Sequence, residues 1–150
     1  DLYRLKGLQN IWQDTDKALS WAVDDLKRKR YIVEQTELFP YKVAPDFNQS
    51  LSEHQFHTRP DLLAQCFLKV ARMLMQESHK SDSTNHPLRE GRSGPVIERT
   101  VSGRKWEAWR LRITGGRMGF RLHYWWSAGE YVLSKVAPHE DFTIGPIPES

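Results

Sequence analysis

The segment spanning residues 106–142 constrains the fold most, because its apolar side chains recur with a period of two. In residues 109–113, Trp, Leu and Ile alternate with two arginines, so a strand here has one apolar and one cationic face. Two glycines at 115–116 supply the positive φ angles of a tight hairpin turn. Further alternating runs at 118–126 and 131–136 follow. The segment predicts an antiparallel meander of three strands.

The second face of this meander is predicted to collect cations and imidazoles. Four of them alternate with the apolar residues along the first two strands, and the fifth directly follows the last strand. They are Arg110, Arg112, Arg121, His123 and His139. Antiparallel pairing would bring them together in a cationic site that contains titratable groups. Trp125 has the same parity as Arg121, so it is expected beside that site.

The rest of the chain predicts helices before the meander. In chain order we expect a helix over 9–30, a strand over 41–44, a weak helix over 47–57, a strong helix over 60–76, a long mobile loop over 77–94 and a strand over 95–101. Helices segregated from an antiparallel meander indicate the α+β class. We predict a three- to four-stranded antiparallel sheet with two or three helices packed on one face, plus an N-terminal helical extension.

Composition limits the classes of function. The 150 residues carry a formal charge of +3, a weak pointer to an anionic partner. Cys66 is the only cysteine, so no internal disulfide is expected, in keeping with a reducing cytoplasm. No run approaches the roughly 20 apolar residues that span a bilayer, so no membrane association is expected. His54 and His57 lack further ligands nearby in sequence, and neither a metal nor another cofactor is expected.

The motifs of the meander resemble the RelE/ParE superfamily of bacterial toxins, notably its RelE-, HigB- and YafQ-like ribonucleases. The resemblance rests on W-R-L-R-I, two glycines, F-R-L-H-Y, a strand and P-H-E-D-F. It covers about residues 41–142, and it implies a toxin domain over 41–143 with a helical extension over 1–40 and an extended tail over 144–150.

The resemblance assigns roles to individual residues. It implies that Arg121 contacts the scissile phosphate and that His139 acts as the acid. Arg110 and Arg112 fall on the family's basic pair. Arginine does not deprotonate in proteins, so we expect Arg112 to stabilise the phosphorane and not to act as a base. Histidine, with an ordinary pKa of about 6.5, suits proton transfer, and His123 is the candidate base.

The expected activity is cleavage of mRNA by attack of the 2′-hydroxyl on the adjacent phosphorus, independent of metal ions. Arg110, Trp125 and Lys105 are expected to bind RNA, with Trp125 stacking on a base. Glu140 or Asp141 is expected to orient His139 or to take the proton of the 2′-hydroxyl. The expected partners are RNA, on or off the ribosome, and a cognate antitoxin protein in the cytoplasm.

Two alternatives stay open at the level of sequence. One is a ParE-like protein that blocks a DNA-handling enzyme without cleaving RNA. The other is a non-catalytic module, within a longer protein, that binds nucleic acid or protein. The sequence does not decide the oligomeric state, and a basic outer sheet face is in many proteins only a solvated surface.

Overall fold

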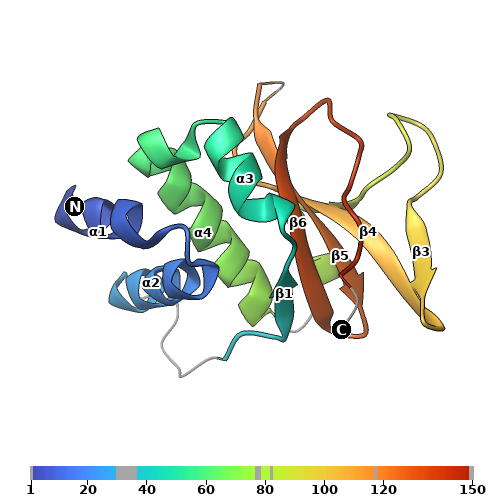
Figure 1. Cartoon of the computed structure of the whole chain (residues 1–150), viewed down its shortest axis with the longest axis horizontal. Helices are drawn as coiled ribbons and strands as arrows, with labels where there is room; N and C mark the ends of the chain where they lie inside the picture. The colour runs from blue at the N-terminus through green and yellow to red at the C-terminus, as the bar shows by residue number, and fades with distance from the viewer. Residues whose placement is uncertain (1, 30–36, 77–78, 82, 117, 149–150) are drawn as a thin grey trace.

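Helices cover one face of a twisted sheet in this protein (Figure 1). The structure is a computed structural model that describes residues 2–29, 37–76, 79–81, 83–116 and 118–148. The α+β class predicted from the sequence is confirmed. Across the described residues, no helix has the length and apolar character needed to cross a bilayer.

The helical layer is built from four α-helices and two single 3₁₀ turns among the described residues. The helices are α1 (Leu2–Ile11), α2 (Thr15–Arg28), α3 (Asp46–Glu53) and α4 (Pro60–Met75), and the 3₁₀ turns are η1 (Phe56–Thr58) and η2 (His79–Ser81). The prediction of α4 is confirmed, and Pro60 begins it, where the missing N–H costs nothing.

The prediction of one continuous helix over 9–30 is wrong. The chain turns between α1 and α2, and the Asp14 carboxylate accepts a hydrogen bond from the Lys17 amide at 3.2 Å. This is an N-terminal cap, which begins a new helix at Thr15. The predicted end at residue 30 lies outside the described residues.

Among the described residues the sheet has six strands, in the order β1-β6-β5-β4-β2, with β3 paired to another part of β4. Their bounds are β1 (Tyr41–Val43), β2 (Asn85–Pro87), β3 (Glu98–Val101), β4 (Arg104–Arg112), β5 (Phe120–Ser127) and β6 (Glu130–Pro138). The predicted meander is confirmed as β4, β5 and β6, which pair antiparallel in sequence order.

Two predictions about the sheet need correction. It is mixed and not purely antiparallel, because β1 runs parallel to β6. The segment 77–94 is not a structureless loop, because β2 lies within it and pairs with the edge of β4. A three-residue strand is too short to show an alternating pattern, and its pairing partner lies far along the chain.

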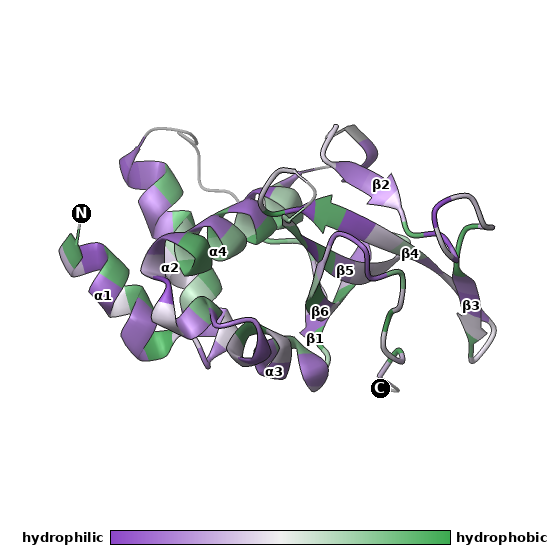
Figure 2. Ribbon diagram, turned by 90° about the horizontal axis from the view of Figure 1, so that it is seen from above, coloured by the Kyte–Doolittle hydropathy of each residue, from purple (hydrophilic) through white to green (hydrophobic). Residues whose placement is uncertain are grey.

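The larger core lies between the helices and one face of the sheet. Leu19 of α2, Phe67 of α4 and Tyr124 of β5 are all fully buried within it. Both N-terminal helices pack on α4 and take part in the same core. Figure 2 shows the helices gathered on one side of the sheet, with the C-terminal end of the chain on the other.

The opposite face of the sheet is covered by the chain that follows β6, residues 139–148, which we call the tail. Its backbone accepts a hydrogen bond from Trp125 Nε1 at the Gly145 carbonyl (3.0 Å), and the Gly145 amide donates to Ser134 Oγ (3.0 Å). Ser134 is the extra residue of a β-bulge, since His123 pairs with Lys135 but Tyr124 pairs with Leu133. The bulge directs both Ser134 and Lys135 toward the tail.

Replacement of Leu19 by alanine tests whether the N-terminal helices belong to the same cooperative unit as the sheet. Leu19 is fully buried, so Leu19→Ala is expected to lower the free energy of unfolding by about 2–5 kcal/mol. Leu2→Ala is the matched control, because Leu2 is 84% exposed and such changes stay within about 0.5 kcal/mol. Urea unfolding followed by helix dichroism and by tryptophan fluorescence should give coincident, shifted transitions. Separate transitions would show that α1 and α2 unfold independently.

Candidate nucleic-acid interface

Three arginines lie together on the tail-facing side of β4 and β5, and of these Arg112 is exposed. Arg112 pairs directly with Arg121, and Arg110 pairs with His123 in the next register position on that face. We call Arg110, Arg112 and Arg121 the arginine face. The predicted gathering of these strand residues is therefore confirmed, while their roles stay predictions.

The positive charge of the arginine face is not neutralised by an ion pair among the described residues. Within the described part of the chain, no carboxylate lies at ion-pair distance from any of its three guanidinium groups. Burial lowers the pKa of Arg121, and the nearby charges of Arg112 and Arg110 lower it further. Like charges directly opposite one another destabilise a sheet. The pairing of Arg112 with Arg121 therefore lowers the stability of the fold.

Arg121 is anchored, whereas Arg112 is open to solvent. Only 7% of Arg121 is exposed, and its Nη1 donates to the carbonyls of Thr114 (2.8 Å) and Phe120 (3.1 Å). The turn between β4 and β5 therefore fixes the guanidinium in place. Arg110 is half-buried, and its Nη1 is buried without a hydrogen-bond partner among the described residues.

His123 is sealed beneath the tail. It is fully buried, and its Nδ1 lies 2.6 Å from the Thr143 carbonyl oxygen. Because a carbonyl only accepts, Nδ1 carries the proton. Burial lowers the pKa of His123 to about 4, despite the opposing effects of the Thr143 carbonyl and Asp141. The expectation that His123 serves as general base is not compatible with this placement, because RNA cannot reach the ring.

Of the predicted RNA-binding residues, Trp125 is buried and Lys105 lies apart from the arginine face. Trp125 is fully buried, with the Arg99 guanidinium 5.2 Å from its ring centroid, so the expected base stacking has no free ring face. Lys105 is exposed but has the parity of the helix-facing residues of β4, and its ammonium lies 3.3 Å from Glu98. Lys105 is therefore separate from the arginine face.

His139 lies at the same end of the sheet as Arg121. Its backbone amide donates to the carbonyl of Gly119 at 3.0 Å, two residues before Arg121. Its Nδ1 is 3.1 Å from Glu140 Oε1, and both oxygens of that carboxylate contact Arg92 Nη2 at 3.0 and 3.1 Å. Hydrogen bonds from Arg92 and His139 lower the pKa of Glu140, so the carboxylate is charged and orients the imidazole.

Asp141, the other carboxylate expected to orient His139, is bonded to other groups. Burial alone would raise the pKa of Asp141, but hydrogen bonds from Thr143 and the ammonium of Lys135 hold it below its ordinary value. Lys135 Nζ contacts Asp141 at 3.0 Å and also donates to Thr143 Oγ1. Asp141 therefore fastens the tail to β6.

Sequence reasoning missed a cleft beside the arginine face. Its volume is about 310 Å³. It is lined by cationic, imidazole and aromatic side chains together with small residues: His86, Pro87, Arg89, Gly91, Arg92, Arg110 and Phe142. His86 reaches it because β2 pairs His86 directly with Arg110. The charged residues within 86–92 could have pointed to this site in the sequence, but the segment was predicted to be a mobile loop.

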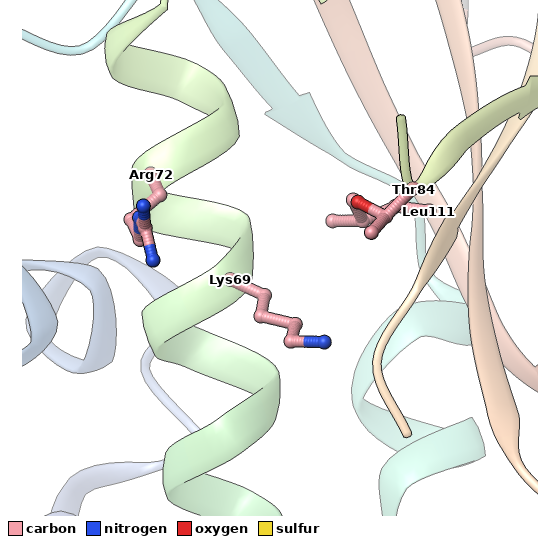
Figure 3. Close-up of a pocket in the computed structure, with 4 residues that line it drawn as sticks. All are labelled: Lys69, Arg72, Thr84 and Leu111. Atoms are coloured by element: carbon pink, nitrogen blue, oxygen red, sulfur yellow. The ribbon is translucent and has the colours of Figure 1, made fainter. Parts of the chain in front are cut away.

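A second cavity lies on the helix side of the sheet and is separate from the arginine face. It has a volume of about 250 Å³ and is lined by Lys69, Arg72, Thr84 and Leu111. Lys69 extends from α4 toward the wall formed by Thr84 and Leu111 (Figure 3). Leu111 belongs to the helix-facing core, so this cavity opens on the other side of β4 from Arg110 and Arg112.

The geometry of the described residues does not form a metal centre, since no three His, Cys, Asp or Glu side chains among them are grouped to hold an ion. Comparison with protein families, with characterised proteins and with solved structures finds no match to this chain.

The buried imidazole of His123 predicts a loss of stability in mild acid. Its pKa is about 4 when folded and about 6.5 when unfolded. Between pH 6.5 and pH 4 the unfolded chain binds this proton and the folded chain does not. The contribution of His123 to the free energy of unfolding is therefore complete above pH 6.5 and is lost as the pH falls toward 4. For this residue the loss from pH 7.5 to pH 5 is about 2 kcal/mol. Asparagine preserves a donor near Nδ1 but does not titrate.

Urea unfolding of the wild type and of His123→Asn at pH 7.5, 6 and 5 measures this loss. The variant is expected to lose less stability on acidification than the wild type. Some pH dependence should remain, because burial beside Trp109 and Trp126 also lowers the pKa of His79 to about 4. Equal slopes for the two proteins would contradict a neutral, buried His123.

Proposed function

We propose that this chain binds RNA across the arginine face and cleaves it by attack of a 2′-hydroxyl, as a RelE-like endoribonuclease. The observation that carries the proposal is the absence, among the described residues, of any carboxylate paired with Arg110, Arg112 or Arg121. An anion bound there would relieve a repulsion that the fold leaves unbalanced.

Magnitudes favour a phosphate ligand at this site. Directly opposed cross-strand residues have Cβ atoms about 5 Å apart. Two like charges near a protein surface repel by about 4 kcal/mol at a separation of about 4 Å and by less at larger separations. The planar guanidinium presents paired donors that match two phosphate oxygens. A nucleic acid carries one negative charge at each phosphodiester, so successive phosphates can pair with the three guanidinium groups.

The His139 and Glu140 pair supplies the proton transfer to the leaving group. The 2′-oxygen forms a bond to phosphorus, and the bond from phosphorus to the 5′-oxygen breaks. With Nδ1 bonded to Glu140, His139 presents Nε2 to donate a proton to the departing 5′-oxygen. Arg112 and the anchored Arg121 stabilise the doubly charged phosphorane. Glu140 is the remaining carboxylate that could receive the proton of the 2′-hydroxyl.

The resemblance of the strand motifs to RelE-like toxins also suggests the biological setting. A free nuclease of this kind would be toxic, so we infer an acidic antitoxin that covers the arginine face in a cytoplasmic toxin–antitoxin pair. Expression of the chain alone should then arrest growth, and coexpression of the antitoxin should restore it.

A non-catalytic RNA-binding module, or a ParE-like inhibitor, is the second candidate. The burial of His123 favours it, because the expected second imidazole for proton transfer is not open to a substrate. The two candidates differ in one measurement, the cleavage of RNA by the purified chain.

A ribonuclease assay in EDTA tests the proposal with single variants. Arg112→Ala and Arg121→Ala are expected to lower the cleavage rate by about 100-fold or more, the size typical of losing one charge-stabilising donor. His139→Ala should lower it by about 100- to 10,000-fold, as for a lost general acid. Because the anchored Arg121 also contributes to folding, the exposed Arg112 is the cleaner test.

Lys105→Ala is the matched control on the same strand, since it removes an exposed cation outside the arginine face. It should cleave at the wild-type rate. Undiminished cleavage by both the Arg112 and His139 variants would rule out the proposed site. Tight RNA binding by the wild type without any cleavage would favour the non-catalytic module.

A further inference from the structure

The cleft beside the arginine face has the composition of an anion site with an aromatic wall. Its cations are drawn from separate parts of the chain: Arg110 from β4, Arg89 and Arg92 from the segment between β2 and β3. An imidazole from β2, that of the exposed His86, faces the same space. Phe142 of the tail also lines the cleft, and its ring centroid is 5.9 Å from the Arg110 guanidinium carbon.

One cation of the cleft, Arg110, has a hydrogen-bond donor without an acceptor in the described part of the chain. Its Nη1 is buried with no hydrogen-bond acceptor among the described residues. Burial lowers the pKa of Arg110, which Glu140 only partly offsets, and Glu140 is itself bonded to Arg92 and His139. A buried charged donor without an acceptor is costly. Arg110 also lines the cleft, so the charge of an anion bound there would offset part of that cost.

The other two cations of the cleft each have a partner: Arg89 has a backbone carbonyl and Arg92 has a carboxylate. Arg89 forms an isolated antiparallel bridge with Val96, and its Nη1 donates to the Gly94 carbonyl at 3.3 Å. The Glu90 amide donates to the Pro95 carbonyl at 2.9 Å, closing the loop. Arg92 is held by Glu140. The cleft is therefore organised without a ligand.

We infer that this cleft is a subsite for one nucleotide of single-stranded RNA, with Arg110 and Arg89 binding its phosphate and Phe142 contacting its base. The identity of the ligand as RNA rests on the proposed function. The volume of about 310 Å³ lies at the lower end of ligand pockets, about 300–1,000 Å³, and suits one nucleotide. Aromatic contact is how proteins commonly hold unpaired bases.

Titration calorimetry of the full chain tests this subsite with three probes: adenosine 3′,5′-bisphosphate, a 2′-deoxy trinucleotide that cannot be cleaved, and inorganic phosphate. The bisphosphate should bind the wild type. Arg110→Gln and Arg89→Gln should each raise its Kd about tenfold or more, as expected for a lost hydrogen bond to a charged group. Arg89 is exposed, so its variant tests the site even if Arg110→Gln unfolds.

Phe142→Leu separates a nucleotide subsite from a simple anion site. It should raise the Kd of the bisphosphate about fivefold or more and leave that of inorganic phosphate unchanged. Arg112→Gln should weaken the trinucleotide. The control Lys105→Gln should leave the Kd of the bisphosphate unchanged, since Lys105 lies outside both the cleft and the arginine face. Binding of inorganic phosphate and bisphosphate with equal Kd, unaffected by Phe142→Leu, would overturn the nucleotide assignment.

The outcomes also separate this inference from the proposed function. Cleavage of RNA without bisphosphate binding would overturn the subsite and leave the nuclease proposal standing. Bisphosphate binding that is lost in the Arg110 and Arg89 variants, in a protein that cleaves no RNA, would support the subsite and overturn the nuclease.

Discussion

The bonds between the tail and the second face of the sheet decide what the rest of the molecule presents to solvent. Trp125 donates to the Gly145 carbonyl, Ser134 accepts from the Gly145 amide, and His123 donates to the Thr143 carbonyl. Each bond satisfies a polar atom that would otherwise lose water without compensation. The tail therefore turns the part of this face around Trp125 into a second core and leaves the end bearing Arg112 open.

The bulge at Ser134 makes this arrangement possible. In a regular strand Leu133 and Lys135 would share a face, and one of them would be misplaced. The extra residue keeps Leu133 and Val136 in the helix-facing core while Ser134 and Lys135 reach the tail. The sequence shows no glycine at this point, so the bulge is specified by what each neighbour contacts and not by local backbone preference.

Local periodicity accounts for what could be predicted. The alternation in β4 and β5 set both the strands and the parity of Arg110, Arg112 and Arg121, and the 3.6-residue spacing set α4. The missed features depend on partners distant in sequence: the parallel pairing of β1 with β6, the pairing of β2 with β4, and the covering tail. Parity places His123 on the correct face, but it does not show that Thr143, twenty residues later, buries it.

The tail also links the closed and open parts of this face. The segment that buries His123 also carries the His139 and Glu140 pair, and it brings Phe142 to the cleft that contains Arg110. Lys135 and Asp141 hold the segment at its start, where both groups are partly screened from water and their attraction is stronger than at a fully exposed site. One short segment therefore buries one imidazole, carries another and lines the cleft. Arg112 is the residue of the arginine face that stays exposed beside this segment.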